Sequence, residues 1–288
     1  MPEEDINIEV IDGLKIKIYT KKNQYSLNCL DPKEYPKFKV ENSKTVFNLD
    51  SDILKCLINQ TAFAISTQES RPLLTGINFK IIGDLLEVTA TDSYRLAKKS
   101  VKLSTTIEEE VNIVIPGKNL IEFDKILTEN KPVEINIFNN KIILKYEDII
   151  FQSNLLNGTY PNTANLIPTD FELIIDVSLS DYYDAVDRAA LLTQSKDKNI
   201  VKMEINEKNM KISSFASELG KVEEEVDIKK NNKNTLEISF SARYMLEALR
   251  TIKEDKILIL LNTDVKPIII KSVKDESLIQ LILPIKTY

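Results

Sequence analysis

The sequence has no histidine among its 288 residues. Histidine is the commonest general base and a frequent metal ligand, so its absence excludes the usual catalytic triad and most catalytic metal sites. Serine follows aspartate at Asp92-Ser93, but a serine without a base to activate it is not a nucleophile. We therefore predict no catalytic residue and no cofactor.

Cysteine is scarce as well. Cys29 and Cys56 are the only two cysteines, and neither belongs to a CxxC pair. Such a count argues against a disulfide framework and against a zinc site, so no metal is predicted. Both cysteines lie among apolar residues and are expected to be small buried side chains.

Long apolar runs are missing too. No stretch approaches the length of a membrane span, and residues 1–5, MPEED, are acidic and unlike a signal peptide. With 43% apolar and 28% charged residues, the composition is that of a soluble globular protein. We expect a cytoplasmic protein with room for two domains and part of a third.

An excess of positive charge is also absent. Lysine and arginine together number 38 against 44 aspartates and glutamates, which gives a net charge of −6. A conventional DNA-binding domain is strongly basic. The bulk charge by itself therefore argues against nucleic acid as a partner.

What the sequence does contain is an internal repeat. Ile8–Pro36 and Ile135–Pro161 each pass through three β-rich runs separated by turns and end in Tyr-Pro. Ile257–Pro284 follows the same course and ends in Leu-Pro. A period of about 120 residues is the size of a domain, whereas stacked solenoid repeats have periods of about 20–50 residues.

Amphipathic helices recur with the same period. An apolar stripe predicts one helix within Phe47–Ser66 and another within Val177–Leu192, where Ser180 is the expected N-cap. A second helix of similar kind is expected in each repeat. Pro116–Leu127 begins with proline, which suits a helix start, and Ser241–Ile252 begins with a serine cap.

The organisation is strand, helix and three strands, used twice in each repeat. This order predicts an α+β fold of tandem domains, each with two helices packed on antiparallel β-sheets. Two complete domains are expected at 46–165 and 166–288. Residues 1–45 match the last strands of a further domain, whose earlier elements have no counterpart in the chain.

Three stretches make the chain resemble a known family. They are SRPLLTGINF at 70–79, ATDSYRLA at 90–97 and LILPIKTY at 281–288, with YPNTANLIP and FSARYMLEAL in support. In this order the sequence resembles the β subunit of bacterial DNA polymerase III, the DNA sliding clamp. In that family two subunits of three domains each close head-to-tail into a ring around duplex DNA. Helices line the hole, sheets form the outer wall, and the ring performs no chemistry.

The resemblance implies a processivity factor that tethers the replicative polymerase. The implied partners are duplex DNA, the α subunit of DNA polymerase III, the clamp loader, and other polymerases and repair proteins with clamp-binding motifs. Those motifs typically carry glutamine followed by leucine and phenylalanine. A sliding ring needs only a modestly positive inner surface while its outer face is acidic, so the net negative charge is compatible with DNA.

The resemblance also places certain residues toward DNA, on the expected helices and in the loop after the first of them. They are Lys55, Gln68, Arg71, Lys118, Lys125, Arg188, Arg250 and Lys253. Acidic residues are mixed among them on the same helices. Ordinary solvated helix surfaces explain the same charges almost as well.

The second implied surface is a hydrophobic peptide-binding groove at the junction of the middle and last domains. It comprises Leu74, Thr91, Ser93, Tyr94, Arg95, Leu96, Pro161, Asn165, Leu166, Tyr244, Pro267, Leu281, Leu283, Pro284 and Ile285. The chemistry agrees, because burying a leucine or phenylalanine anchor contributes roughly 1.5–3 kcal/mol, and the polar turn expected at Thr91–Arg95, between two apolar runs, offers hydrogen bonds. The turn is then a binding rim, although one of the alternating leucines near the C-terminus can equally be core.

Two features depart from the commonest family pattern. Ser93-Tyr94 stands where Gly-His is frequent, and Asn165 stands where a basic residue is often found. Both changes bear on polar specificity and leave the apolar pocket intact. Because half of the first domain has no counterpart, we expect the chain to close a homodimeric ring poorly, which light scattering tests.

Two other functions stay open. An enzyme would need carboxylates, such as Asp92 with Asp84 or Glu87, to hold magnesium, and a cleavage activity lost in Asp92→Asn would reveal it. A protein–protein scaffold would keep the peptide groove without encircling DNA. It would show no association with primed or nicked circles.

Overall fold

The structure is a computed structural model that describes residues 5–11, 13–35, 43–193 and 199–286. The chain divides into two compact units, Met1–Asn42 and Ser43–Tyr288. The first unit holds an antiparallel three-stranded sheet of β1 (Asn7–Ile11), β2 (Lys15–Tyr19) and β3 (Gln24–Asn28), followed by the short helix η1 (Pro32–Glu34). Pro36 of the first Tyr-Pro pair and the last two residues of LILPIKTY lie outside the described residues.

The prediction that both cysteines are buried is wrong. Cys29 follows β3 and is exposed, and Cys56 on the first helix is only half-buried. A three-stranded sheet by itself encloses little apolar volume. Among the described residues of its own unit, Cys29 therefore has no core to enter.

The described part of the second unit contains two large hydrophobic cores, besides two small apolar clusters. The first core is built from β4 (Thr45–Asp50), α1 (Ser51–Thr61), β5 (Gly76–Thr91), β6 (Arg95–Pro116), α2 (Gly117–Asp124), β7 (Pro132–Ile137), β8 (Lys141–Tyr146) and β9 (Ile149–Asn154). Strands β4-β7-β8-β9 form a four-stranded antiparallel sheet. Helices α1 and α2 bury Leu54, Leu57, Leu120 and Phe123 in this core, as their apolar stripes predict.

The runs expected as separate strands between residues 76 and 116 are joined into the two long strands β5 and β6. They pair antiparallel from Gly76↔Pro116 to Thr91↔Leu96, with register shifts on either side of Gly83. Gly83 has φ +63 and no atoms where a Cβ would stand. Glycine adopts this left-handed conformation without steric cost, so the irregularity falls there.

The second core follows the predicted order of strand, helix and three strands, twice. Its elements are β10 (Leu173–Ser178), α3 (Leu179–Ala190), β11 (Ile200–Ile205), β12 (Asn209–Ala216), β13 (Gly220–Lys230), β14 (Leu236–Ser241), α4 (Ala242–Leu249), β15 (Lys256–Leu261), β16 (Ile268–Ser272) and β17 (Leu278–Ile282). The predicted α+β class, with helices packed on antiparallel sheets, is confirmed. The domain limits at 45/46 and 165/166 stay predictions.

The helix caps differ in part from the prediction. Ser178, not Ser180, caps α3, because the chain leaves β10 in an extended conformation at Ser178 and its hydroxyl accepts the N–H of Asp181. Ser241 does occupy the N-cap position of α4, but its side chain makes no capping hydrogen bond. None of the helices in the described residues is long and apolar enough to cross a membrane.

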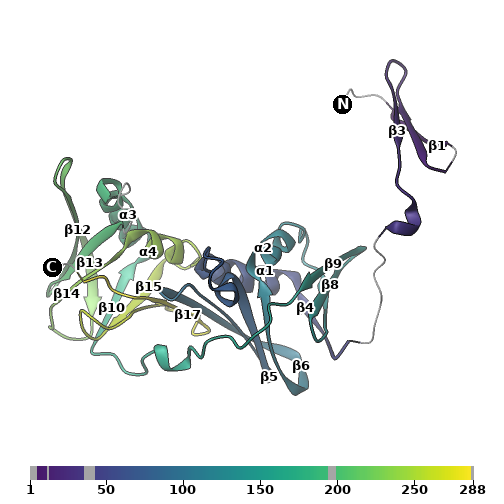
Figure 1. Ribbon diagram of the computed structural model, residues 1–288. Helices are drawn as coiled ribbons and strands as arrows, with labels where there is room; N and C mark the ends of the chain where they lie inside the picture. The colour runs from purple at the N-terminus through teal and green to yellow at the C-terminus, as the bar shows by residue number, and fades with distance from the viewer. Residues whose placement is uncertain (1–4, 12, 36–42, 194–198, 287–288) are drawn as a thin grey trace. The chain divides into compact units, whose positions relative to one another are not determined.

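One ten-stranded sheet joins the two cores, in the order β14-β11-β12-β13-β10-β15-β16-β17-β6-β5. Strand β17 of the second core pairs antiparallel with β6 of the first, from Leu278↔Lys99 to Ile282↔Arg95. Phe63, just after α1, packs against both cores. Figure 1 shows the four helices along one side of this unit, with β5, β6, β15 and β17 on the other.

An ion pair reinforces the junction between the cores. Lys99 of β6 pairs with Asp275 in the turn between β16 and β17, and the Ser277 hydroxyl donates to the same carboxylate at 2.5 Å. Burial by itself raises the pKa of Asp275. The hydrogen bonds from Lys99 and Ser277 outweigh burial and hold that pKa below its usual value.

We expect Asp275→Asn to lower the free energy of unfolding by about 1–2 kcal/mol at neutral pH, because Lys99 loses its partner. Since the folded-state pKa is lowered, this contribution is complete above the unfolded-state pKa of about 3.9 and is lost as pH falls through the folded-state pKa. Urea unfolding from neutral pH down to acid measures the difference. Exposed Glu207→Gln is the control, and a loss that does not change with pH would contradict the assignment.

Candidate functional site

The turn between β5 and β6 is held in shape by its own polar side chains. The Asp92 carboxylate accepts the backbone N–H groups of Tyr94 and Arg95, at 2.9 and 3.0 Å. The Thr91 hydroxyl donates to the Arg95 carbonyl at 2.6 Å and accepts the Ser93 N–H at 3.1 Å. Side chains of this type satisfy turn backbones, so the turn presents one defined conformation.

Arg95 is only 7% exposed, and its guanidinium is engaged within the protein. It donates through Nε to Asp92 at 3.0 Å and through Nη1 to Glu247 of α4. The guanidinium also lies over the rings of Tyr244, at 4.4 Å, and Phe63, at 5.3 Å. Arg95 therefore fastens the turn to the second core, and its predicted contact with a peptide stays a prediction.

Tyr94 and the segment after β17 form the exposed border of the site. Tyr94 is 59% exposed and stacks on Tyr244 with ring centroids 6.5 Å apart. The Tyr94 carbonyl accepts the N–H of Leu283 at 2.9 Å, and Ile285 donates its N–H to the carbonyl of Ser239 at 2.7 Å. The backbone is therefore fixed on both sides of Pro284, to the turn at Leu283 and to β14 at Ile285.

An apolar base lies at the junction of the two cores. Its buried members are Leu96, Leu260, Ile269 and Leu281, and partly buried Ile167, Phe171, Ile174, Leu258 and Ile279 pack against them. Leu96 stands opposite Leu281 in the pairing of β6 with β17. The neighbouring Leu166 and Leu283 are 52% and 38% exposed. A buried apolar base bordered by exposed leucines is suited to holding an apolar side chain from another molecule.

Leu74 reaches the turn indirectly. It is buried with Val114 and Tyr160 in a separate cluster, and the Tyr160 hydroxyl accepts the backbone N–H of Thr91 at 3.1 Å. Burial, reinforced by the charge of Asp92, raises the pKa of Tyr160 well above its usual range, so the hydroxyl stays protonated. Pro161 and Asn165 are exposed, and Pro267 is half-buried just before β16.

The second unit matches two known protein domains in succession. The family model for the central domain of the DNA polymerase III β subunit matches residues 48–162, and the model for its C-terminal domain matches residues 164–286. The β sliding clamp of Bacillus subtilis is 39% identical over all of this chain and 77% of the relative's length. That of Staphylococcus aureus strain Mu50 is 37% identical over all of this chain and 76% of the relative.

The chain belongs to the DNA polymerase III β-subunit family. The crystal structure of the Bacillus subtilis clamp matches with a TM-score of 0.93 and covers 98% of this chain and 75% of that one. The structure from Streptococcus pyogenes matches with a TM-score of 0.92 at 31% identity, over 98% of this chain and 76% of that one. The family resemblance predicted from the motifs is confirmed, and with it the prediction that the chain is a non-catalytic member of that family.

Two of the three carboxylates weighed for a magnesium site in the enzyme alternative have other roles in the structure. Asp92 holds the turn and Arg95, and Glu87 of β5 pairs with Lys98 of β6. Among the described residues no group of three or more suitable side chains stands ready to hold a metal ion.

The residues predicted to face DNA fall into two sets. Four are exposed and free of carboxylate partners within the described chain: Gln68, Arg71, Lys118 and Lys253. The other four are engaged: Lys55 with the Leu127 carbonyl at 2.7 Å, Lys125 with Glu122, Arg188 with Glu224 of β13, and Arg250 with the Tyr183 hydroxyl at 2.8 Å. Their positions toward DNA stay a prediction.

Pattern reasoning missed several residues that build the site. Phe63 carries no local signal, and Tyr160 was noted only in the Tyr-Pro repeat, because each matters to the site through a contact far away along the chain. Glu247 lies on an amphipathic helix, where a glutamate is expected to face solvent. Its pairing with Arg95 becomes visible only when α4 lies beside the turn.

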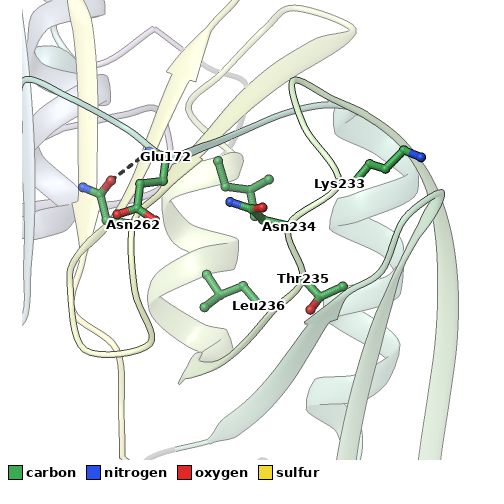
Figure 2. A pocket seen from close by; sticks show the side chains of 7 residues that line it. Glu172, Lys233, Asn234, Thr235, Leu236 and Asn262 are labelled. Carbon is green, nitrogen blue, oxygen red and sulfur yellow. Dashed lines mark hydrogen bonds between the residues drawn. The ribbon is translucent and has the colours of Figure 1, made fainter.

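An open cleft of about 380 Å³ lies elsewhere on the second core (Figure 2). Glu172, Leu173, Lys233, Asn234, Thr235, Leu236 and Asn262 line it. Asn262 accepts the Glu172 N–H at 2.9 Å and so bridges the loop after β15 to the start of β10. No predicted groove residue lines this cleft, so it is separate from the candidate site.

Proposed function

We propose that this member of the DNA polymerase III β-subunit family is a sliding clamp. It encircles duplex DNA and tethers partners through a groove at the Thr91–Arg95 turn. The observation that carries the proposal is the apolar base of Leu96 and Leu281, which is bordered by exposed Tyr94, Leu166 and Leu283. The names of the relatives support the clamp assignment, since they are β sliding clamps. The partners proposed are the polymerase α subunit, the clamp loader, and other polymerases and repair proteins.

The groove suits an extended peptide with apolar anchors. Leucine and phenylalanine side chains from the peptide would settle against the apolar base, and the exposed leucines would close over them. Tyr94 offers a hydroxyl and a ring face for a polar residue such as glutamine. Because the turn is already ordered by Asp92 and Thr91, binding loses little conformational entropy there.

Encirclement of DNA can be tested by comparing retention of the protein on circular and on linear DNA. The protein would be loaded with a clamp loader onto a nicked circle and followed by gel filtration before and after the circle is linearised. Retention that disappears on linearisation supports a closed ring. Peptide binding without such retention would favour the second candidate, a scaffold that keeps the groove and does not encircle DNA. The net charge of −6 and the pairing of Arg188 with Glu224 favour that candidate.

The charge of Arg188 gives a separate prediction. Its guanidinium makes two hydrogen bonds to the Glu224 carboxylate, at 2.9 and 3.0 Å, so its charge is largely compensated. We expect Glu224→Gln to free Arg188, to strengthen binding of a duplex and to steepen the salt dependence by about one phosphate contact. Glu207→Gln removes the same charge without releasing an arginine and is the control. Equal effects of the two variants would show that only net charge matters.

A further inference from the structure

The loop proposed to approach DNA is bonded directly to the turn proposed to bind peptides. Arg71 follows Gln68 in this loop, and its Nη1 donates to the Ser93 hydroxyl at 3.0 Å. Arg71 is exposed, and no carboxylate pairs with it among the described residues. This hydrogen bond therefore joins the proposed DNA-facing loop to the proposed peptide-binding turn. Because no carboxylate neutralises Arg71 among the described residues, its guanidinium can also bind an anion.

Ser93 is an unusual place for a hydrogen-bond acceptor. Its φ of +78 lies in the left-handed region, where glycine is favoured and other residues are strained. A glycine would adopt this backbone freely but would give Arg71 nothing to bind. The serine therefore brings a hydroxyl to the turn at the expense of backbone strain, and Arg71 uses that hydroxyl.

A second path connects the same two segments. Leu74 lies in the short helix η3 (Pro72–Thr75), which begins directly after Arg71, and its N–H donates to the Arg71 carbonyl at 3.0 Å. Leu74 packs with Tyr160, whose hydroxyl accepts the Thr91 N–H. A shift of the loop would therefore displace the turn at two positions. Packing of Leu74 on Tyr160 transmits the shift to Thr91, and the hydrogen bond from Arg71 transmits it to Ser93.

A phosphate competes with Ser93 for Arg71. The present bond joins a guanidinium to a neutral hydroxyl, whereas a phosphate oxygen is charged and fits the planar guanidinium in a bidentate manner. Both bonds have a charged donor, but only the bond to phosphate adds the Coulombic attraction between opposite charges. Duplex DNA at the loop therefore draws Arg71 away from Ser93 and leaves the strained residue without that restraint.

We propose that Arg71 and Ser93 couple the two surfaces, so that a phosphate bound by Arg71 weakens peptide binding at the turn; this inference rests on the proposed function. Asp92 and Thr91 still hold the rest of the turn, but Ser93 without Arg71 has to be ordered again by the peptide, which lowers the peptide's affinity. Loss of about one hydrogen bond corresponds to a change of about fivefold in the dissociation constant. By linkage, the peptide weakens duplex binding by the same factor.

The test is a fluorescence-anisotropy titration of a labelled glutamine–leucine–phenylalanine peptide into the full chain, with and without a saturating short duplex. The reverse titration uses a labelled duplex with and without unlabelled peptide. Variant Ser93→Gly removes the acceptor and keeps the backbone conformation. Glu147→Gly is the matched control, since Glu147 is also a non-glycine residue at positive φ, +51, outside both surfaces.

The native chain and Glu147→Gly are expected to lose about fivefold in peptide affinity when the duplex is present, and Ser93→Gly is expected to show no loss. If the native chain binds the peptide with the same affinity with and without bound duplex, the coupling is overturned, but the proposed groove is not. An equal loss in Ser93→Gly would also overturn it, because the duplex would then act by covering the groove. Absence of peptide binding without duplex would remove the proposed function and the coupling together.

Discussion

Replacing Leu166 and Leu283 together by alanine is expected to weaken binding of a glutamine–leucine–phenylalanine peptide by roughly 100-fold. Each leucine borders the apolar base and is substantially exposed in the free protein. A peptide anchor that covers both removes their apolar surface from water, and burial of a leucine contributes roughly 1.5–3 kcal/mol. Taking the lower end for two partly exposed side chains gives about 3 kcal/mol, which corresponds to roughly 100-fold.

This pair is chosen because its substitution leaves the fold in place. Leu96 and Leu281 are buried in the apolar base, and truncating either one leaves a cavity and costs about 2–5 kcal/mol of stability. Lost peptide binding in such variants would be ambiguous. Exposed leucines carry little of the folding energy, so thermal unfolding of the Leu166→Ala/Leu283→Ala variant should match that of the native chain.

The matched control is Phe215→Ala/Leu219→Ala. These two side chains are each 67% exposed on the β12–β13 hairpin of the second core and lie outside the predicted groove. The control removes at least as much exposed apolar surface and should bind the peptide with native affinity. Anisotropy titrations of the three proteins decide the matter. Native affinity in the groove variant would mean that peptides do not cross the turn and the C-terminal segment.

Replacing Arg95 by alanine is expected to lower the free energy of unfolding by about 3 kcal/mol. Removing one member of a buried ion pair costs about 3–5 kcal/mol because the other charge is left without a partner. Here Asp92 is nearly buried and Glu247 is partly exposed, so the lower end applies. The variant also loses the contacts of the guanidinium with the rings of Tyr244 and Phe63.

Arg243→Ala is the control for this prediction. Arg243 also lies over the ring of Tyr244, at 5.1 Å, but it is exposed and pairs with no carboxylate among the described residues. A cation above an aromatic ring at an exposed site contributes about 0.5–1 kcal/mol, so a loss within that range is expected. Urea unfolding followed by circular dichroism compares the two variants. Similar losses would show that Arg95 acts only through the ring and not as the tie between the cores.

Much of the fold was predictable because its signals are local. The apolar stripes of α1, α2, α3 and α4 depend on residues three or four positions apart. Because the chain repeats, each kind of helix occurs twice, and each occurrence supports the prediction of the other. Where the prediction failed, a neighbouring element decided the outcome. The chain direction at the end of β10 made Ser178 the cap of α3 in place of Ser180. Cys29 is exposed because the β1–β3 sheet has no core to receive it.

The candidate site was also predictable only in part, because neighbouring elements decide what each of its residues contacts. Family resemblance indicated the groove residues as a set, with Leu96 expected in the apolar pocket and both Tyr94 and Arg95 expected to offer hydrogen bonds to a peptide. Their burial separates them: Tyr94 is exposed, Arg95 is bonded to Asp92 and Glu247, and Leu96 is part of the apolar base. In an extended strand, successive side chains point to opposite faces, so neighbours along the sequence enter different environments.

The sequence by itself determined the repeat, the α+β class, the absence of a histidine-based active site, and the family. The first three follow from composition or from spacing along the chain, which no packing arrangement can alter, and the family follows from the resemblance of three motifs to those of known members. The tertiary structure alone decided that β17 pairs with β6, that Arg95 reaches Glu247, and that Arg71 reaches Ser93. These contacts join residues brought together by strand register and by chain reversal, and a shift of one residue in that register would turn every side chain of the strand to the other face.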